Sequence, residues 1–125
     1  MEKTSRNFSV KLSPLDYRVR GIPKGGIGAR EFHKRRSEII TAEEGSFELL
    51  VEDVWGRKKT VALPNAATYG IIGPYVLHTY VALSNNAALH VVANTLYDRK
   101  RPATYDSYPE SEFRRLQATV RRNKS

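Results

Sequence analysis

Turn-forming residues recur at short intervals along most of the chain, and this spacing constrains the fold more than any other feature. The segments between the turns alternate apolar and polar residues; Phe47 and Leu49, for example, fall on one face of their segment and Glu48 on the other. Many short strands at even spacing predict an all-β sandwich or barrel. We expect loops at Pro23–Gly28 and Ser84–Asn86. The predicted strands are Phe8–Leu12, Tyr17–Ile22, Glu38–Thr41, Ser46–Val54, Lys58–Leu63, Tyr69–Ile72, Val76–Leu83 and Ala87–Asn94.

The last part of the chain has helical rather than strand periodicity. Pro109 stands near a helix start and is followed by acidic residues, which suit the positive end of a helix dipole. Phe113, Leu116 and Val120 then recur at helical spacing. We therefore predict one domain, 1–125, with an N-terminal strand region at 7–22, a barrel at 23–97 and a helix at about 108–122.

The composition excludes several classes of protein and of site. The chain has 125 residues and no cysteine, so disulfides, thiolate metal sites and cysteine nucleophiles are ruled out. No apolar segment is long enough to span a membrane, and the first residues do not lead into the apolar region of a signal peptide. We therefore expect a cytoplasmic protein.

The net charge of +8, from 21 basic and 13 acidic residues, favours anionic partners. The basic clusters can be solvated turns or phosphate-binding groups. We consider nucleic acid an unlikely partner, because the chain has no nucleic-acid-binding motif and no basic stretch rich in aromatic residues.

One constellation of residues has a spacing with chemical meaning. Gly25, Glu31, His33, Glu38 and Gly45 resemble the first cupin motif, G-x5-H-x-H-x4-E-x6-G, with Glu31 in place of the first histidine. The segment Gly73–His78 is a candidate for the second cupin motif, which supplies one further histidine. The resemblance predicts an all-β cupin fold, a double-stranded β-helix (jelly-roll barrel), with the short helix at its C-terminus.

The resemblance is closest to one branch of the cupins, and it runs from about Tyr17 to Phe113. The matching pieces are Glu31-Phe32-His33-Lys34, Gly45-Ser46, Gly73-Pro74-Tyr75-Val76-Leu77-His78, Ala93-Asn94-Thr95-Leu96-Tyr97-Asp98 and Tyr105-Asp106. In this order they resemble the WxcM-like family of dTDP-4-keto-6-deoxyglucose 3,4-ketoisomerases. The chain departs from the family at Glu31, at Leu77 in place of a tryptophan, and at Gly28, where the family has an arginine.

The resemblance implies an isomerase of deoxysugar and polysaccharide biosynthesis. Such enzymes move a keto group between C3 and C4 of a nucleotide-linked sugar through an enediol, and they use no metal or other cofactor. The resemblance also implies a nucleotide-sugar ligand, and a homodimer that pairs through N-terminal strands such as Phe8–Leu12. In the aligned positions, only the second histidine of the family's catalytic pair is present, at His33.

Strand geometry adds to this assignment. Residues two apart on a strand point to the same side, so Glu31 and His33 can both face the barrel interior, and so can His78 and Tyr80. We predict that His33 is the catalytic base and that Glu31 is the proton donor or the group that tunes the pKa of His33 upward. The predicted substrate-binding residues are Tyr17, Arg30, Lys34, His78 and Tyr80, with Arg30 and Lys34 near the diphosphate.

Two other functions stay open at this point. Glu31, His33, Glu38 and His78 together could hold a first-row divalent metal, as in a metal-dependent cupin enzyme. A degenerate motif on an intact fold is also what a non-catalytic cupin that binds sugars or nucleotide sugars would have. Some residues have simpler interpretations as well: Glu31 can lie exposed at the rim, Glu38 can pair with a neighbouring arginine, and His90 can be structural.

Overall fold

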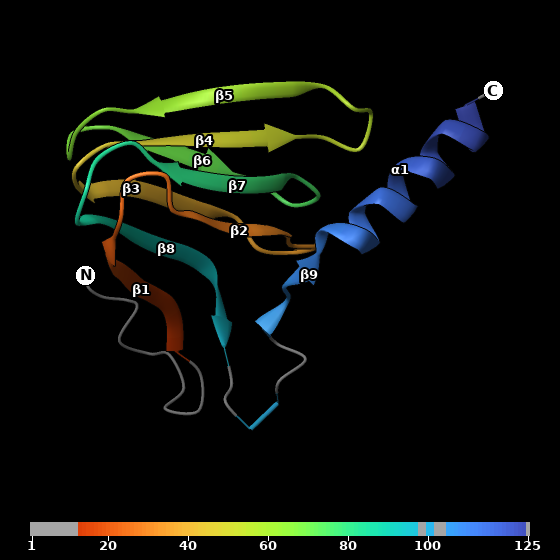
Figure 1. The fold of residues 1–125 in the computed structure, drawn as a ribbon. Helices are drawn as coiled ribbons and strands as arrows, with labels where there is room; N and C mark the ends of the chain where they lie inside the picture. Colours follow the sequence, from red (N-terminus) through yellow and green to blue (C-terminus); the bar gives the residue numbers. More distant parts are fainter. Residues whose placement is uncertain (1–12, 98–99, 102–104, 125) are drawn as a thin grey trace.

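The computed structural model describes residues 13–97, 100–101 and 105–124, which form two antiparallel β-sheets packed face to face and one helix (Figure 1). One sheet has the order β1-β8-β3-β6 and the other the order β5-β4-β7-β2-β9. The bounds are β1 (Ser13–Ile22), β2 (Ile27–Phe32), β3 (Glu38–Glu44), β4 (Phe47–Glu52), β5 (Lys58–Leu63), β6 (Tyr69–Ile72), β7 (Leu77–Ala82), β8 (Ala87–Tyr97), β9 (Tyr108–Pro109) and α1 (Glu110–Lys124). The predicted all-β fold with a short C-terminal helix is confirmed.

The strands differ from the sequence prediction mainly at β2. The stretch Pro23–Gly28 is a loop only as far as Gly26, and the prediction is wrong for Ile27 and Gly28, which begin β2. The strand is hard to detect because Gly28 has no side chain to continue an alternating pattern: the ring of Tyr80 occupies the space that a Cβ atom would need. The predicted strand Phe8–Leu12 lies outside the described residues.

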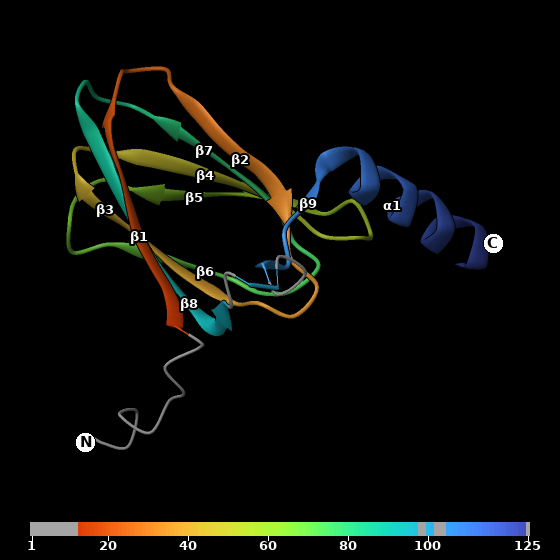
Figure 2. The ribbon, with the colours of Figure 1, turned by 90° about the horizontal axis from the view of Figure 1, so that it is seen from below.

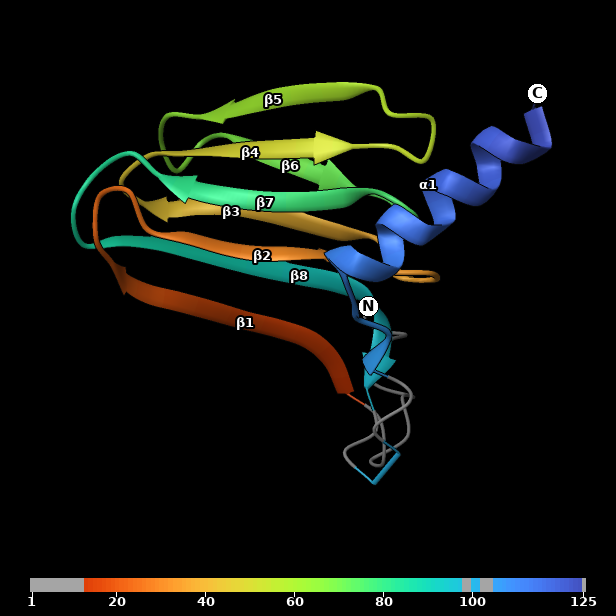
Figure 3. The ribbon, with the colours of Figure 1, turned by 45° about the vertical axis from the view of Figure 1, so that its right-hand side comes forward.

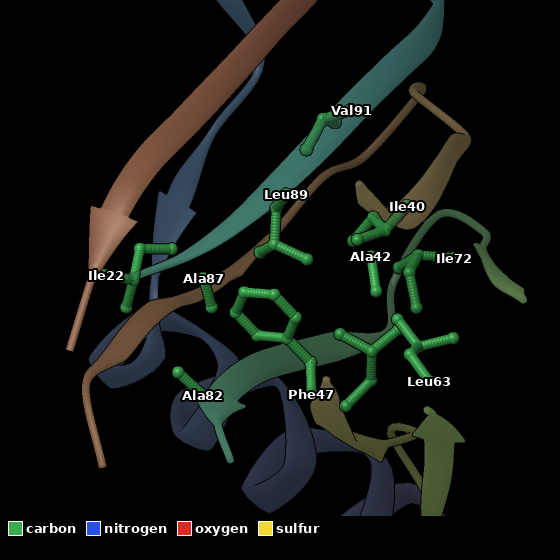
Figure 4. Close-up of a cluster of buried hydrophobic side chains, with 11 residues drawn as sticks. Ile22, Ile40, Ala42, Phe47, Leu63, Ile72, Ala82, Ala87, Leu89 and Val91 are labelled. Carbon is green, nitrogen blue, oxygen red and sulfur yellow. The ribbon is translucent and has the colours of Figure 1, made fainter. Parts of the chain in front are cut away.

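The hydrophobic core fills the space between the two sheets (Figure 4). Residues of β3 and β8 pack from one side, and residues of β4, β5 and β7 from the other. Figure 2 shows these strands in their two layers. Ile40, Leu89 and Val91 belong to this core and also line a cavity at its edge. The apolar core therefore forms part of the wall of the candidate site. The core residues are Ile22, Ile40, Ala42, Phe47, Leu49, Leu63, Ile72, Ala82, Ala87, Leu89 and Val91.

The helix α1 is attached to the sandwich through its first turns. Phe113 is fully buried against Phe32, with ring centroids 5.3 Å apart, and Leu77 completes this small cluster. The later turns of α1 extend away from the two sheets (Figures 1 and 3). In the part of the chain that the structure describes, no helix combines the length and the hydropathy needed to cross a membrane.

Candidate active site

A cavity of about 240 Å³ lies between the two sheets, next to the core. Its apolar wall is formed by residues of β1, β2, β3 and β8, and its polar groups come from five different segments of the chain. The fold therefore assembles the polar groups from positions far apart in the sequence. The lining residues are Tyr17, Val19, Ala29, Glu31, Glu38, Ile40, His78, Tyr80, Leu89, Val91 and Tyr105.

A β-bulge in β2 turns Glu31 toward this cavity. Ala29 pairs with Thr79 and Glu31 with His78, so that Arg30 is an extra residue without a partner position on β7. Ala29 and Arg30 have φ angles of 71° and 59°, in the left-handed region that few non-glycine residues adopt. Regular alternation from Gly28 would have placed Arg30 inward and Glu31 outward; the bulge reverses this arrangement.

Two imidazoles converge on one buried carboxylate at the cavity. Nε2 of His33 lies 3.3 Å from Oε2 of Glu38, and Nε2 of His78 lies 3.4 Å from Oε1 of the same residue. Oε2 of Glu31 is 3.8 Å from Nε2 of His33. Oε2 of Glu38 also accepts a hydrogen bond of 3.1 Å from the guanidinium of Arg36. Glu38 is therefore the centre of the cluster, rather than the partner of an arginine alone.

The other ring nitrogen of each histidine is bound to the backbone. Nδ1 of His33 is 2.8 Å from the carbonyl oxygen of Asp106, and Nδ1 of His78 is 3.0 Å from that of Val76. A carbonyl oxygen can only accept, so Nδ1 carries the hydrogen in both rings. Each neutral ring therefore presents a lone pair at Nε2. Nε2 of His33 is buried and has no hydrogen-bond partner of adequate geometry among the described residues.

The cluster shifts the pKa values of its members in the expected directions. Burial alone would lower the pKa of His33, but the nearby Glu38 carboxylate and the Asp106 carbonyl raise it above its ordinary value. Burial would raise the pKa of Glu38, yet the two histidines hold it well below the usual range. Burial, together with the charges of Glu38 and Glu31, raises the pKa of the Tyr17 phenol, which therefore stays protonated. The upward shift predicted for His33 is present, but Glu38 causes it rather than Glu31.

The structure brings together most of the predicted site residues. Tyr17, Glu31, His78 and Tyr80 line the cavity together with Glu38. His33 lies immediately behind this lining, fully buried, while Glu31 keeps 26% of its side chain exposed. Glu31 is thus the member of the pair that a ligand in the cavity would meet first.

Two predicted diphosphate-binding residues lie elsewhere. Arg30 is on the outer side of β2, in a separate surface hollow shared with Lys58 and Arg114, because of the bulge described above. Nζ of Lys34 is 2.9 Å from Oε2 of Glu112 on α1. Neither side chain lines the cavity. His90 is on the outer face, where its Nε2 is 2.7 Å from Oδ1 of Asp16.

Three residues of the site were given no site role by the sequence: Arg36, Tyr105 and Asp106. Arg36 stands in the basic run Lys34–Arg36, which has the pattern of a solvated turn, yet its side chain is fully buried. It donates to Glu38 and to the carbonyl of Tyr105, and its guanidinium lies 5.0 Å from the Tyr105 ring centroid. Two signals were available in the sequence: Arg36 stands two residues before Glu38, and Tyr105-Asp106 matches a piece of the family pattern. Neither signal shows that these segments, about 70 residues apart, come together.

The chain is similar to a known family over most of its length. The family described as FdtA: WxcM-like, C-terminal matches residues 3–112. No curated protein is similar enough to count as a relative.

Solved structures share the fold at low sequence identity. A 3,4-ketoisomerase from Helicobacter canadensis has a TM-score of 0.69 and 18% identity, covering 83% of this chain and 74% of that one. WlaRA, a TDP-fucose-3,4-ketoisomerase from Campylobacter jejuni, has a TM-score of 0.67 and 21% identity, covering 85% and 74%. QdtA, a sugar 3,4-ketoisomerase from Thermoanaerobacterium thermosaccharolyticum, has a TM-score of 0.69 and 17% identity, covering 87% and 74%.

Proposed function

Because the chain belongs to the FdtA family (WxcM-like, C-terminal), we propose that it is a nucleotide-sugar isomerase-like cupin that binds a dTDP-4-keto-6-deoxyhexose and moves a proton beside the carbonyl. The observation that carries this proposal is that His33 and His78 converge on Glu38 at the cavity, with the carboxylate of Glu31 beside His33. Similar structures support the ligand class: QdtA was crystallised with TDP, and a mutant of QdtA was crystallised with TDP-4-keto-6-deoxyglucose.

In the proposed mechanism Glu31 and His33 act as one acid–base unit. Glu31 lines the cavity and meets the substrate, and His33, with Nε2 at 3.8 Å from the carboxylate, exchanges the proton with it. Removal of the proton on C3 leaves its electron pair in a new C3–C4 double bond, while the C4 oxygen takes up a proton to give the enediol. Loss of the proton on the C3 oxygen and protonation at C4 then leave the ketone at C3.

The other polar groups of the cavity have matching roles. The Tyr17 phenol stays protonated and can donate a hydrogen bond to the oxygen on which negative charge develops. His78 shares Glu38 with His33, so its Nε2 atom lies on the same side of the cavity and can contact a ligand there. Donors placed in advance around a developing oxyanion lower the barrier because they need no reorganisation during the reaction.

Product analysis tests this function. We expect the protein to convert dTDP-4-keto-6-deoxyglucose into an isomer with the ketone at C3, detected by NMR, and Glu31→Gln to lose about 100-fold or more of the rate. Lys59→Gln, an exposed change on β5, is the matched control and should keep full activity. Binding of the nucleotide sugar without turnover would instead support the non-catalytic binding cupin.

A metal-dependent reaction is a second candidate, favoured by one observation. Donor atoms of Glu31, His33 and His78 all lie within 4.8 Å of one another, and the Nε2 atom of His33 is buried without a hydrogen-bond partner among the described residues. Two imidazoles and carboxylates suit first-row divalent ions, which would polarise a substrate carbonyl. The guanidinium of Arg36 on Glu38 opposes a further positive charge. About one ion per chain in elemental analysis of the purified protein, lost in His33→Ala, would move the assignment to this function.

We also propose that the protein is a homodimer, as the family resemblance implies. On the outer face of the first sheet, Ile39 of β3 pairs with Ile71 of β6 and with Val92 of β8, and these three exposed apolar side chains form one row. Such a row is a candidate contact for a second copy. Light scattering should give twice the mass of one chain at micromolar concentration; a monomer mass would contradict the proposal.

A further inference from the structure

The segment that precedes β9 is tied to the turn that carries His33. The carboxylate of Asp106 accepts hydrogen bonds from the backbone N–H groups of Lys34, Arg35 and Arg36, at 3.0, 2.9 and 2.9 Å. The backbone carbonyl of the same residue accepts from Nδ1 of His33 at 2.8 Å. One residue therefore binds both the side chain of His33 and the backbone that follows it.

The geometry of Asp106 is specialised for this double contact. Its φ angle is 59°, a left-handed conformation that aspartate and asparagine tolerate better than most residues. Only 8% of the residue is exposed. Burial would raise the pKa of its carboxyl, but the three N–H donors lower it, so the carboxylate is charged and remains an acceptor.

The contact determines which nitrogen of His33 can take part in proton transfer. While the Asp106 carbonyl holds the hydrogen on Nδ1, the lone pair of the neutral ring stays on Nε2, which faces Glu31 and Glu38. In the opposite tautomer Nε2 would carry a hydrogen and could not accept a proton.

We propose that Asp106 is a positioning residue that fixes the tautomer of His33: its carboxylate holds the turn 34–36 in place, and this in turn keeps its carbonyl on Nδ1. The catalytic role of His33 rests on the function proposed above, but the tautomer does not, so it can be measured without any substrate.

The experiment is long-range ¹H–¹⁵N NMR of protein labelled with ¹⁵N in its histidines, recorded at a pH where the rings are neutral. The chain has only three histidines, so His33→Asn, His78→Asn and His90→Asn assign every signal. In the wild type we expect His33 with hydrogen on Nδ1 and none on Nε2. In Asp106→Gly, which keeps the left-handed backbone accessible but removes the carboxylate, we expect a mixture of both tautomers. Asp106→Asn, which keeps an acceptor, should restore most of the wild-type signal.

Asp53→Gly provides the matched control. Its carboxylate also accepts from backbone N–H groups in a turn, those of Trp55 and Arg57, but it lies away from the cavity. The Asp53→Gly variant should be less stable than the wild type, but its His33 signals should remain unchanged. Two results would overturn the proposal: a wild-type His33 with its hydrogen on Nε2, or a folded Asp106→Gly variant in which the hydrogen stays on Nδ1. If Asp106→Gly does not fold, the wild-type spectrum alone decides whether the proposal stands.

A kinetic arm separates this proposal from the proposed function. If the protein is an isomerase, Asp106→Gly should lower kcat about tenfold or more with little change in KM, because the proton-transfer group rather than the ligand contact is affected. An equal loss in Asp53→Gly would indicate a general loss of folded protein and contradict a positioning role. A protein without isomerase activity would refute the proposed function and leave the tautomer result unaffected.

Discussion

The interior of the sandwich has an apolar part and a polar part, and the two are built on the same strands. Around Phe47, Leu49 and Leu63 the sheets pack through apolar side chains. Where β2 ends and β3 begins, the same interior holds Arg36 and Glu38, with 0% and 2% exposed, beside two histidines. Burying charges costs free energy that an apolar pair would not require. The comparison shows that the polar part does not follow from the needs of folding, and it supports a functional site there.

The largest expected effect comes from breaking the polar part at its centre. Glu38→Gln should lower the free energy of unfolding by about 3–5 kcal/mol, because the buried guanidinium of Arg36 loses its carboxylate partner. Glu44→Gln, an exposed change on the same strand, should stay within about 0.5 kcal/mol of the wild type. Urea unfolding followed by circular dichroism measures both. Equal stability of Glu38→Gln and the wild type would show that Glu38 is not the charge that compensates Arg36.

A substitution in the apolar part should lower the free energy of unfolding by a similar amount, but for a different physical reason. Phe47 is fully buried, so Phe47→Ala should cost about 3–5 kcal/mol through lost burial and a residual cavity. Leu50→Ala, on the same strand but exposed, is the control and should have little effect. A small loss in Phe47→Ala would mean that the sheets do not pack tightly at this position.

The pH dependence of stability separates the two parts. The pKa of Glu38 is lowered from 4.5, so its contribution is complete above that value and is lost as the pH falls toward the lowered pKa. The pKa of His33 is raised from 6.5, so its contribution is complete below that value and is lost as the pH rises through the raised pKa. The difference between the wild type and Glu38→Gln should therefore shrink in acid, whereas that between the wild type and Phe47→Ala should not. Parallel pH curves for both variants would contradict this account.

The sequence predicts the apolar part of the interior better than the polar part, and the reasons are physical. Alternation and turn spacing locate the apolar part well, because β-strands expose every second residue to the core, as Phe47 and Leu49 do. The motif spacing also identifies Glu31, His33, Glu38 and His78. The bulge at Arg30 could not be predicted, because one extra residue reverses the faces of a strand without changing its composition. The role of Asp106 could not be predicted either: the resemblance includes Tyr105-Asp106, but the contacts of Asp106 join segments about 70 residues apart, which no local pattern records.

The smallest expected effect concerns the attachment of α1 to β4. Nε2 of Gln117 donates to Oε2 of Glu52 at 2.7 Å, and Arg114 donates to the same oxygen at 2.8 Å. Gln117→Ala should lower the free energy of unfolding by about 1.5–3 kcal/mol, the net contribution of a hydrogen bond to a charged group, without affecting the cavity. Gln117→Glu, which places a second carboxylate at Glu52, should cost more. A change in nucleotide-sugar affinity in Gln117→Ala, measured by calorimetry, would show that α1 is part of the site.

The most direct test of the central claim is hydrogen exchange at the carbon beside the substrate carbonyl. A dTDP-4-keto-6-deoxy sugar is incubated with the protein in D₂O and followed by ¹H NMR. The wild type should incorporate deuterium next to the carbonyl, increasingly fast as the pH rises through the raised pKa of His33, and His33→Asn should lose about 100-fold or more of that rate. Exchange that survives in His33→Asn but is lost in Glu31→Gln would reassign the base to Glu31 alone. Exchange in the wild type no faster than in buffer would contradict the claim that this polar cluster moves protons.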